Sequence, residues 1–261
     1  MTSTSRKTTP PPVRGVWCIR RNFAFIDAMR TRGLSSYRHV VKRYADLAPS
    51  YDTRWRAYLG RTIGHAVEAL NLSGTERVLD VGCGTGAFER MAVGRFPHLA
   101  IVGIDLTPAM VAVARIKSAT CPQASFLVAK AEALPFDTEQ FDAVIVVNVL
   151  HHVQDPHRAV QECLRVLRPH GRVIVVDWCR DFWHCRVMHY WLTWTDHGYV
   201  RMYRLAELAA LIEHEARAAE VEEARRFIVP PLYGILRVVA RKEASGIVRV
   251  HDACHRRSLA G

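Results

Sequence analysis

Apolar residues recur at helical spacing in the first part of the chain and gather into short runs in the second. One helical stripe begins at Tyr37, and another runs from Trp55 to Leu70. Apolar positions of period 3.6 with polar residues between them predict amphipathic helices. Ser73-Gly74 then marks a turn. We therefore expect a helical segment over 35–74 that precedes the main domain.

Short apolar runs alternate with helical patterns from Arg77 onward. Thr107-Pro108 and Asp155-Pro156 each set an N-cap residue before a proline, a pattern with which helices begin. Strands that alternate with helices form a parallel sheet with right-handed crossovers and helices on both faces. The runs predict five such strands, at Arg77–Val81, Ala100–Asp105, Ser125–Ala129, Phe141–Val147 and Val173–Asp177.

The last part of the chain predicts a helix followed by a hairpin. We expect the helix over Leu205–Glu223 and strands over Arg226–Val229 and Ile235–Arg241, joined by a Pro-Pro-Leu-Tyr-Gly turn. The expected fold is of the α/β class, a doubly wound, seven-stranded and mostly parallel sheet. It has a C-terminal antiparallel hairpin and a helical N-terminal extension, and the main domain spans 75–242.

Composition limits where the protein works. The chain has 261 residues, 49% of them hydrophobic. It holds no apolar run near the roughly 18 residues that a membrane span needs. Seven cysteines, an odd number at scattered positions, suit a reducing compartment better than a secreted protein. We therefore expect a bacterial cytoplasmic protein without a membrane span.

The chain is basic, with 36 Lys and Arg against 25 Asp and Glu. Much of the excess lies in two expected tails, 1–34 and 243–261, whereas the middle mixes both signs. Pro10-Pro11-Pro12 favours a disordered first tail, although the acid-free stretch 1–26 also fits an organelle transit peptide. Solvated tails account for the charge better than a nucleic-acid surface does.

The glycine loop Gly82-Cys83-Gly84-Thr85-Gly86 follows a predicted strand and precedes a predicted helix. Glycines at such a turn let a ligand approach the backbone closely. Gly82, Gly84 and Ala87 also satisfy the dinucleotide pattern G-x-G-x-x-A. Asp80 separates the two interpretations. Its carboxylate would repel a pyrophosphate, but it would stabilise the ammonium and sulfonium groups of S-adenosylmethionine (SAM).

Together with four further blocks, this loop resembles the class I SAM-dependent methyltransferases. Within them, it is similar to the small-molecule branch that includes the ubiquinone and menaquinone biosynthesis methyltransferases. The resemblance reaches from Tyr44 to Arg241, and it implies a Rossmann-like fold with SAM as the cofactor. Its blocks, in order, are Val78–Gly86, Val102–Asp105, Ala131–Phe136, Phe141–His152 and Leu164–Gly171.

The resemblance implies roles for particular positions. Asp80 and the loop glycines would hold the amino-acid part of SAM, Asp105 the ribose hydroxyls, and Ala131 with Glu132 the adenine edge. Lys130 departs from the family, which often has an acceptor there for the adenine amino group. The expected cofactor contacts are Tyr51, Asp80, Gly82, Gly84, Gly86, Asp105, Leu106, Ala131, Glu132 and Asn148.

Aromatic side chains crowd segment 178–204, which follows the fifth predicted strand at the edge where open α/β sheets bind ligands. They predict either a lid around an apolar or aromatic acceptor or an ordinary satellite core. By position, His151, His152 and His184 are candidate general bases, with structural roles as the alternative. No group of Cys and His has zinc-site spacing, so we expect no metal.

We therefore expect methyl transfer from SAM to a small, aromatic or lipophilic molecule by in-line displacement. An RNA or protein methyltransferase is the first alternative. Residues 148–151 lack the Asn-Pro-Pro-Tyr signature of amino methylation on nucleic acids. A non-catalytic SAM-binding accessory protein is the second alternative, and Asp80 disfavours an NAD oxidoreductase. Neither the acceptor nor the oligomeric state follows from the sequence.

Overall fold

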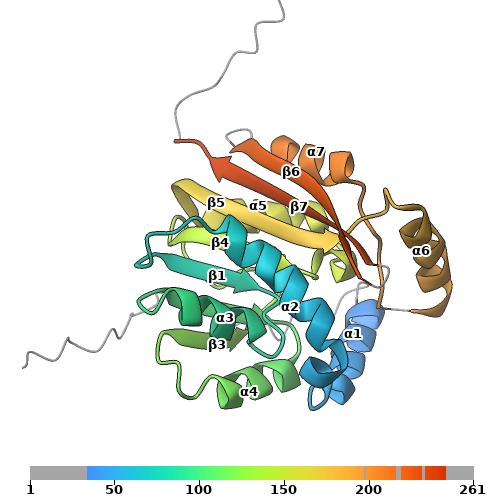
Figure 1. The fold of residues 1–261 in the computed structure, drawn as a ribbon, viewed down its shortest axis with the longest axis horizontal. Helices are drawn as coiled ribbons and strands as arrows, with labels where there is room; N and C mark the ends of the chain where they lie inside the picture. Colours follow the sequence, from blue (N-terminus) through green and yellow to red (C-terminus); the bar gives the residue numbers. More distant parts are fainter. Residues whose placement is uncertain (1–33, 197, 216–218, 231–232, 245–261) are drawn as a thin grey trace, which may run out of the picture.

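A computed structural model describes residues 34–196, 198–215, 219–230 and 233–244. The predicted tails lie almost wholly outside the described residues. A seven-stranded sheet runs through the molecule in the order β3-β2-β1-β4-β5-β7-β6 (Figure 1). Its strands are β1 (Arg77–Val81), β2 (Ala100–Asp105), β3 (Ala124–Val128), β4 (Phe141–Val147), β5 (Leu167–Trp178), β6 (Ala219–Val229) and β7 (Tyr233–Lys242).

The strand directions confirm the predicted doubly wound sheet. The first five strands pair in parallel, and β7 pairs antiparallel with both β5 and β6. Helices cover both faces of the sheet (Figure 1). They are α1 (Leu34–Leu47), α2 (Tyr51–Ala69), α3 (Ala87–Arg95), α4 (Pro108–Lys117), α5 (Pro156–Val166), α6 (Trp183–Thr195) and α7 (Leu205–Glu215), with a short 3-10 turn over Leu150–His152.

Neighbouring side chains of the central strands enter two different cores. Val144 on β4 packs in a core shared with α5 and α7, whereas Ile145 packs in a core shared with α2 and α3. A strand that is buried on both faces has a continuous run of apolar residues in its sequence, and residues 143–147 form such a run. Each buried Val, Leu or Ile side chain stabilises the fold by about 1.5–3 kcal/mol.

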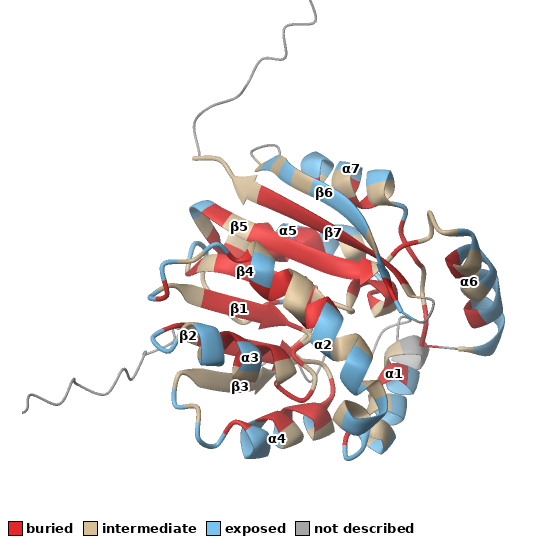
Figure 2. Ribbon diagram, in the orientation of Figure 1, coloured by how far each residue is buried: buried red, intermediate tan, exposed pale blue. Residues whose placement is uncertain are grey.

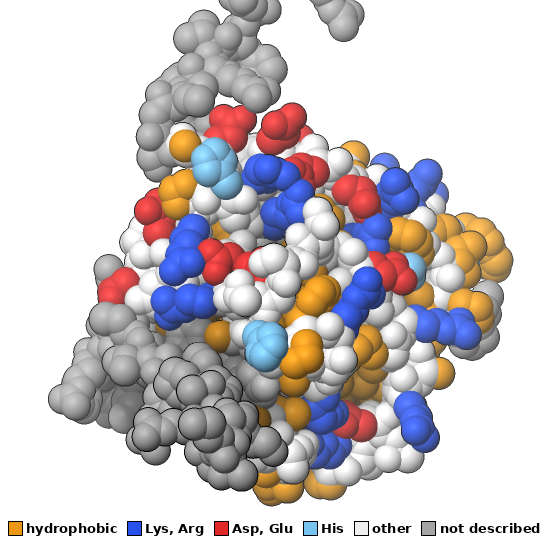
Figure 3. All heavy atoms as spheres, turned by 60° about the vertical axis from the view of Figure 1, so that its left-hand side comes forward, with side chains coloured by type: hydrophobic (Ala, Val, Ile, Leu, Met, Phe, Trp, Pro, Cys, Tyr) orange, Lys and Arg blue, Asp and Glu red, His pale blue; other side chains and the backbone are white. Residues whose placement is uncertain are grey.

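The surface contrasts with these cores. Figure 2 shows buried strands flanked by helices whose outer sides are exposed. Figure 3 shows Lys and Arg interspersed with Asp and Glu over one face, so the charge of this face is mixed in sign. Among the described helices, none is long and apolar enough to cross a bilayer.

The predicted helix over Leu205–Glu223 is too long. Helix α7 ends at Glu215, and β6 begins at Ala219. The residues that open β6 are good helix formers, since they are mostly Ala, Glu and Arg. β6 nevertheless pairs with β7 from end to end. Its sheet hydrogen bonds are long-range interactions that outweigh local preference. β5 also starts earlier than predicted, at Leu167, through an irregular register opposite Phe141.

Candidate functional site

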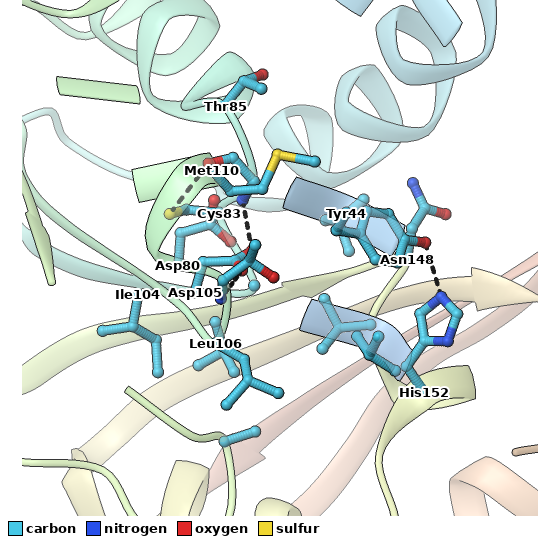
Figure 4. Close-up of a pocket in the computed structure, with 18 of the residues that line it drawn as sticks. Tyr44, Asp80, Cys83, Thr85, Ile104, Asp105, Leu106, Met110, Asn148 and His152 are labelled. Carbon is cyan, nitrogen blue, oxygen red and sulfur yellow. Dashed lines mark hydrogen bonds between the residues drawn. The ribbon is translucent and has the colours of Figure 1, made fainter. Parts of the chain in front are cut away.

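A pocket lies where β1, β2 and β4 end (Figure 4). It holds about 1020 Å³ of empty space, its open mouth included. Gly86, one of the ten expected cofactor contacts, is not among its lining residues; a Cβ there would lie 3.1 Å from the Phe126 ring. The other expected contacts do line it: Tyr51, Asp80, Gly82, Gly84, Asp105, Leu106, Ala131, Glu132 and Asn148.

The glycine loop needs its glycines for backbone reasons. The φ angles of Gly82, Gly84 and Gly86 are 83°, 52° and 78°, in the left-handed region that disfavours side chains. Gly82 carries a second constraint, because a Cβ there would lie 2.1 Å from Cγ2 of Val149. The loop backbone therefore passes directly against the segment that follows β4.

Two backbone N–H groups hold the Asp105 carboxylate at the end of β2. Gly84 N donates to Oδ2 at 3.0 Å, and Thr107 N donates to Oδ1 at 2.7 Å. Burial raises the pKa of Asp105, and the two N–H bonds oppose that shift because they favour the charged form. Each carboxylate oxygen keeps acceptor capacity that suits a pair of ligand hydroxyls.

Asp80 forms a buried acid pair with Glu89 of α3. Burial raises the pKa of Asp80 to about 8, and repulsion from Asp105 adds to the effect. Burial and the adjacent Asp80 likewise raise the pKa of Glu89. The pair thus retains a proton at neutral pH, and a cation bound beside it would favour release of that proton.

Helix α1 and the start of α2 form a cover over the pocket, residues 37–51. The Tyr37 hydroxyl donates to Oε1 of Glu132 and accepts a 3.1 Å bond from Gln154 N. Lys130 Nζ lies 4.2 Å from the centre of the Tyr37 ring, in a cation–π contact. The residue that departs from the family pattern, Lys130, therefore supports the cover.

Asp52 anchors the start of α2. It accepts hydrogen bonds from Thr85 Oγ1, from Arg90 at 3.0 Å and from Lys117 Nζ at 2.7 Å. Burial opposes ionisation of Asp52, but these bonds and charges hold its pKa below its usual value. The contacts join α2 to the glycine loop, α3 and α4, and keep the neighbouring Tyr51 in the pocket wall.

Asn148 is positioned by a chain of side-chain hydrogen bonds. Its Oδ1 accepts from the Tyr58 hydroxyl at 2.7 Å, and its Nδ2 donates to Thr62 Oγ1 at 3.0 Å. Trp178 Nε1 donates to the Tyr58 hydroxyl at 2.6 Å. Sequence reasoning missed Tyr58, Thr62 and Glu89. Helical periodicity marks the two α2 residues only as helix positions and cannot show what they face across the fold.

The three candidate histidines have different surroundings. His152 lines the pocket, whereas His151 and His184 are not among the lining residues. His151 is buried, with Nδ1 2.7 Å from Oδ1 of Asp177 and its ring stacked on Trp178. His184 stands on α6, where its ring contacts the rings of Phe182 and Trp183. The geometry thus brings one of the three to the pocket.

The aromatic segment 178–204 contributes none of the pocket's described lining residues. Tyr199 and Met202 lie instead in a satellite core with α6, which is the packing alternative. The role of segment 178–204 as a lid over the acceptor stays a prediction. Among the described residues, His157, His214 and Glu215 could jointly hold an ion. These three lie outside the pocket lining, so the pocket chemistry does not involve them.

Comparisons with known proteins point to methyltransferases. Residues 79–175 match the family described as "Methyltransferase domain". The chain is 34% identical over 177 residues to the ubiquinone/menaquinone biosynthesis C-methyltransferase UbiE of Geobacter sulfurreducens, covering 59% of this chain and 66% of the relative. It is 35% identical to a demethylmenaquinone methyltransferase of Thermus thermophilus over 146 residues, which are 51% of this chain and 63% of that protein. The chain thus spans less than two thirds of either relative.

A solved structure supports the fold. The putative methyltransferase of Haloferax volcanii, in complex with the Trm112 methyltransferase activator, superposes with a TM-score of 0.68 at 21% identity, covering 77% of this chain and 98% of that one. The fold and the domain match indicate an α/β protein of the methyltransferase type, with SAM as the cofactor. Residues 79–175 match a methyltransferase domain, and the chain is similar to class I SAM-dependent methyltransferases.

Proposed function

We propose that this protein transfers a methyl group from SAM to a small aromatic or lipophilic acceptor. The observation that carries the proposal is that Asp80 and Asp105, near the ends of the adjacent strands β1 and β2, line the same pocket beside the glycine loop. A side chain at Gly82 would collide with Val149, so the loop backbone stays bare beside the pocket. The buried acids suit a cation and a pair of hydroxyls. The pyrophosphate of a dinucleotide would be repelled by the Asp80 carboxylate, which lies close to the helix N-terminus where a pyrophosphate normally binds.

The family resemblance implies which residues would hold SAM, and this arrangement suits those roles. Asp80 and the loop would take the amino-acid part, Asp105 the ribose, and Ala131 with Glu132 the adenine edge. Bound SAM supplies an electrophilic methyl group on a sulfonium. The protein's part is alignment of the acceptor and exclusion of water, and the cover serves both needs.

An acceptor that loses a proton would need a base, and His152 is the candidate that geometry favours. Its Nδ1 lies 2.7 Å from the Gly198 carbonyl, which can only accept, so Nδ1 carries the proton and the Nε2 lone pair accepts from the Tyr44 hydroxyl. Burial and the neighbouring His151 lower the pKa of His152 to about 3. His152 is therefore a weak base while the pocket is closed, and it serves chiefly to place Tyr44.

The first test is calorimetric titration with SAM and S-adenosylhomocysteine, with NADH as the control, on the protein and on Asp105→Ala. Micromolar binding of both adenosyl ligands, lost in the variant, supports the proposed site. Absence of adenosyl binding would overturn it. Transfer of labelled methyl groups to aromatic and quinone-like acceptors then tests turnover. RNA and protein substrates serve as the comparison arm, and binding without any turnover would favour an accessory role.

A further inference from the structure

Helix α6 exposes a row of large apolar side chains. Trp183 and Trp194 are 76% and 86% exposed. Residues 183, 187, 191 and 194 are spaced three or four apart, and residue 190 lies three after 187, so all five share one face of the helix. We call this face the aromatic stripe; its members are Trp183, Val187, Tyr190, Trp191 and Trp194. In Figure 2, α6 stands at the edge of the molecule with its outer side exposed.

The opposite face of α6 provides the packing of this helix. Cys185 and Leu192 are buried in a satellite core with Tyr199 and Met202. Gly234 N donates to Cys185 Sγ at 3.2 Å, which ties α6 to β7. The aromatic stripe therefore adds little to the packing of the described residues. A contiguous exposed apolar patch of this kind marks an interaction surface.

Most of the charged side chains next to the stripe are basic. Helix α6 contains no acid, and its Arg186 is exposed. Helix α1 meets the end of α6 through the ion pair of Arg43 with Asp196. α1 also carries exposed Arg38 and Lys42 and a single acid.

We propose that the aromatic stripe, together with the basic outer side of α1, binds the surface of an anionic lipid bilayer. Trp and Tyr favour the boundary between headgroups and acyl chains, because their rings are apolar with one polar atom. Basic side chains beside them are attracted to anionic headgroups. The same composition distinguishes this surface from an apolar face that would pair with a second protein, where charge at the centre is depleted.

The position of the surface relates it to the pocket. The inner side of α1 lines the pocket through Tyr37, Val40 and Tyr44. A bilayer against the outer side of α1 would therefore lie next to the cover. If the proposed transfer to a lipophilic acceptor is correct, that acceptor would enter from the bilayer. The lipid-binding proposal itself stands on the stripe and its charges and is tested without turnover.

The experiment uses the full chain with vesicles of phosphatidylcholine, alone or with about a third phosphatidylglycerol. Co-sedimentation should show binding to the anionic vesicles, with a blue shift of tryptophan emission. The triple variant Trp183→Ser/Trp191→Ser/Trp194→Ser should bind about tenfold more weakly or worse. The matched control is Ile116→Ser/Ile228→Ser, because these two side chains are 75% and 61% exposed on other elements. It should bind like the original protein.

Both variants should keep the original circular dichroism spectrum, since every substituted side chain is exposed. Full vesicle binding by the triple variant would overturn the proposal, because it would assign lipid binding to another part of the chain. Failure of the original protein to bind anionic vesicles would overturn it as well. Self-association that the triple variant loses, without vesicle binding by either protein, would assign the stripe to a second copy of the chain and would also contradict the proposal.

Discussion

The hydroxyl of Tyr44 donates a 2.7 Å hydrogen bond to Nε2 of His152, joining the cover to the segment after β4 across 108 residues of sequence (Figure 4). The direction of this bond follows from Nδ1 of the same ring, whose proton goes to the Gly198 carbonyl. Burial raises the pKa of Tyr44 far above its usual value, so the phenol remains a donor. The bond closes one side of the pocket.

Loss of this bond should loosen the cover. Tyr44→Phe removes the donor and leaves a partly buried acceptor, a change worth about 1 kcal/mol. We expect the affinity for S-adenosylhomocysteine to fall by about fivefold, corresponding to that energy. Isothermal titration measures the change. Tyr190→Phe is the control because Tyr190 is 68% exposed on α6, and equal effects of the two substitutions would contradict the assignment.

His152 should make stability depend on pH. Its pKa is lowered to about 3 in the fold, so below about pH 6.5 the unfolded chain binds a proton that the folded chain does not. The contribution is fully present above that pH and is lost as pH falls towards 3, by at most about 1.4 kcal/mol per pH unit. Denaturant unfolding at pH 7 and 5 should show a smaller loss for His152→Gln. The same loss in both proteins would refute this linkage. Full turnover by His152→Gln would also remove it as a base.

Cofactor binding should release a proton from the acid pair. The pKa of Asp80 is raised to about 8 in the empty pocket, and an ammonium group beside it favours the carboxylate. Affinity for S-adenosylhomocysteine should therefore rise between pH 6 and 8. Calorimetry in buffers of different ionisation enthalpy counts the proton directly. Asp80→Asn should bind far more weakly, yet its ligand-free form should melt at a higher temperature at neutral pH, because it no longer buries an acid. No proton release would contradict the prediction.

Gly82→Ala should damage the pocket for two separable reasons. The substituted Cβ would collide with Val149, and a side chain at φ 83° is strained by about 1–2 kcal/mol. The double variant Gly82→Ala/Val149→Ala should recover part of the cofactor affinity but not the backbone strain. The control is Gly60→Ala on α2, where nothing lies within 4 Å of the added Cβ. There we expect a gain of roughly 0.5–1 kcal/mol in unfolding free energy. Normal ligand binding by Gly82→Ala would show that the loop tolerates a side chain.

Tyr37→Phe should speed dissociation of the cofactor. The substitution removes the hydroxyl that bonds Glu132 and Gln154, and leaves the Lys130 contact with the ring in place. We expect the off-rate of S-adenosylhomocysteine to rise by about threefold to tenfold, as the loss of one or two hydrogen bonds predicts. Stopped-flow displacement measures the rate. Lys130→Met tests the cation–π contact separately, and unchanged off-rates in both variants would mean that the cover does not limit release.

Much of this protein is readable from local patterns. The strand ends, the glycine loop and the acids Asp80 and Asp105 follow from periodicity and residue type, because a βαβ unit places its turns and ligands at set points along the chain. The same locality explains the error at Ala219. Composition there favours a helix, and the decisive pairing with β7 is with residues distant in the sequence.

Contacts between distant segments were decided by the tertiary structure alone. It set Glu89 against Asp80, brought Tyr37 onto Glu132, and placed His152 rather than His151 or His184 in the pocket wall. It also left the aromatic stripe of α6 uncovered, although the sequence suggested either a lid or a core. Sequence spacing determines which residues share an element, but packing of one element on another determines which side chains meet, lose water and change their pKa.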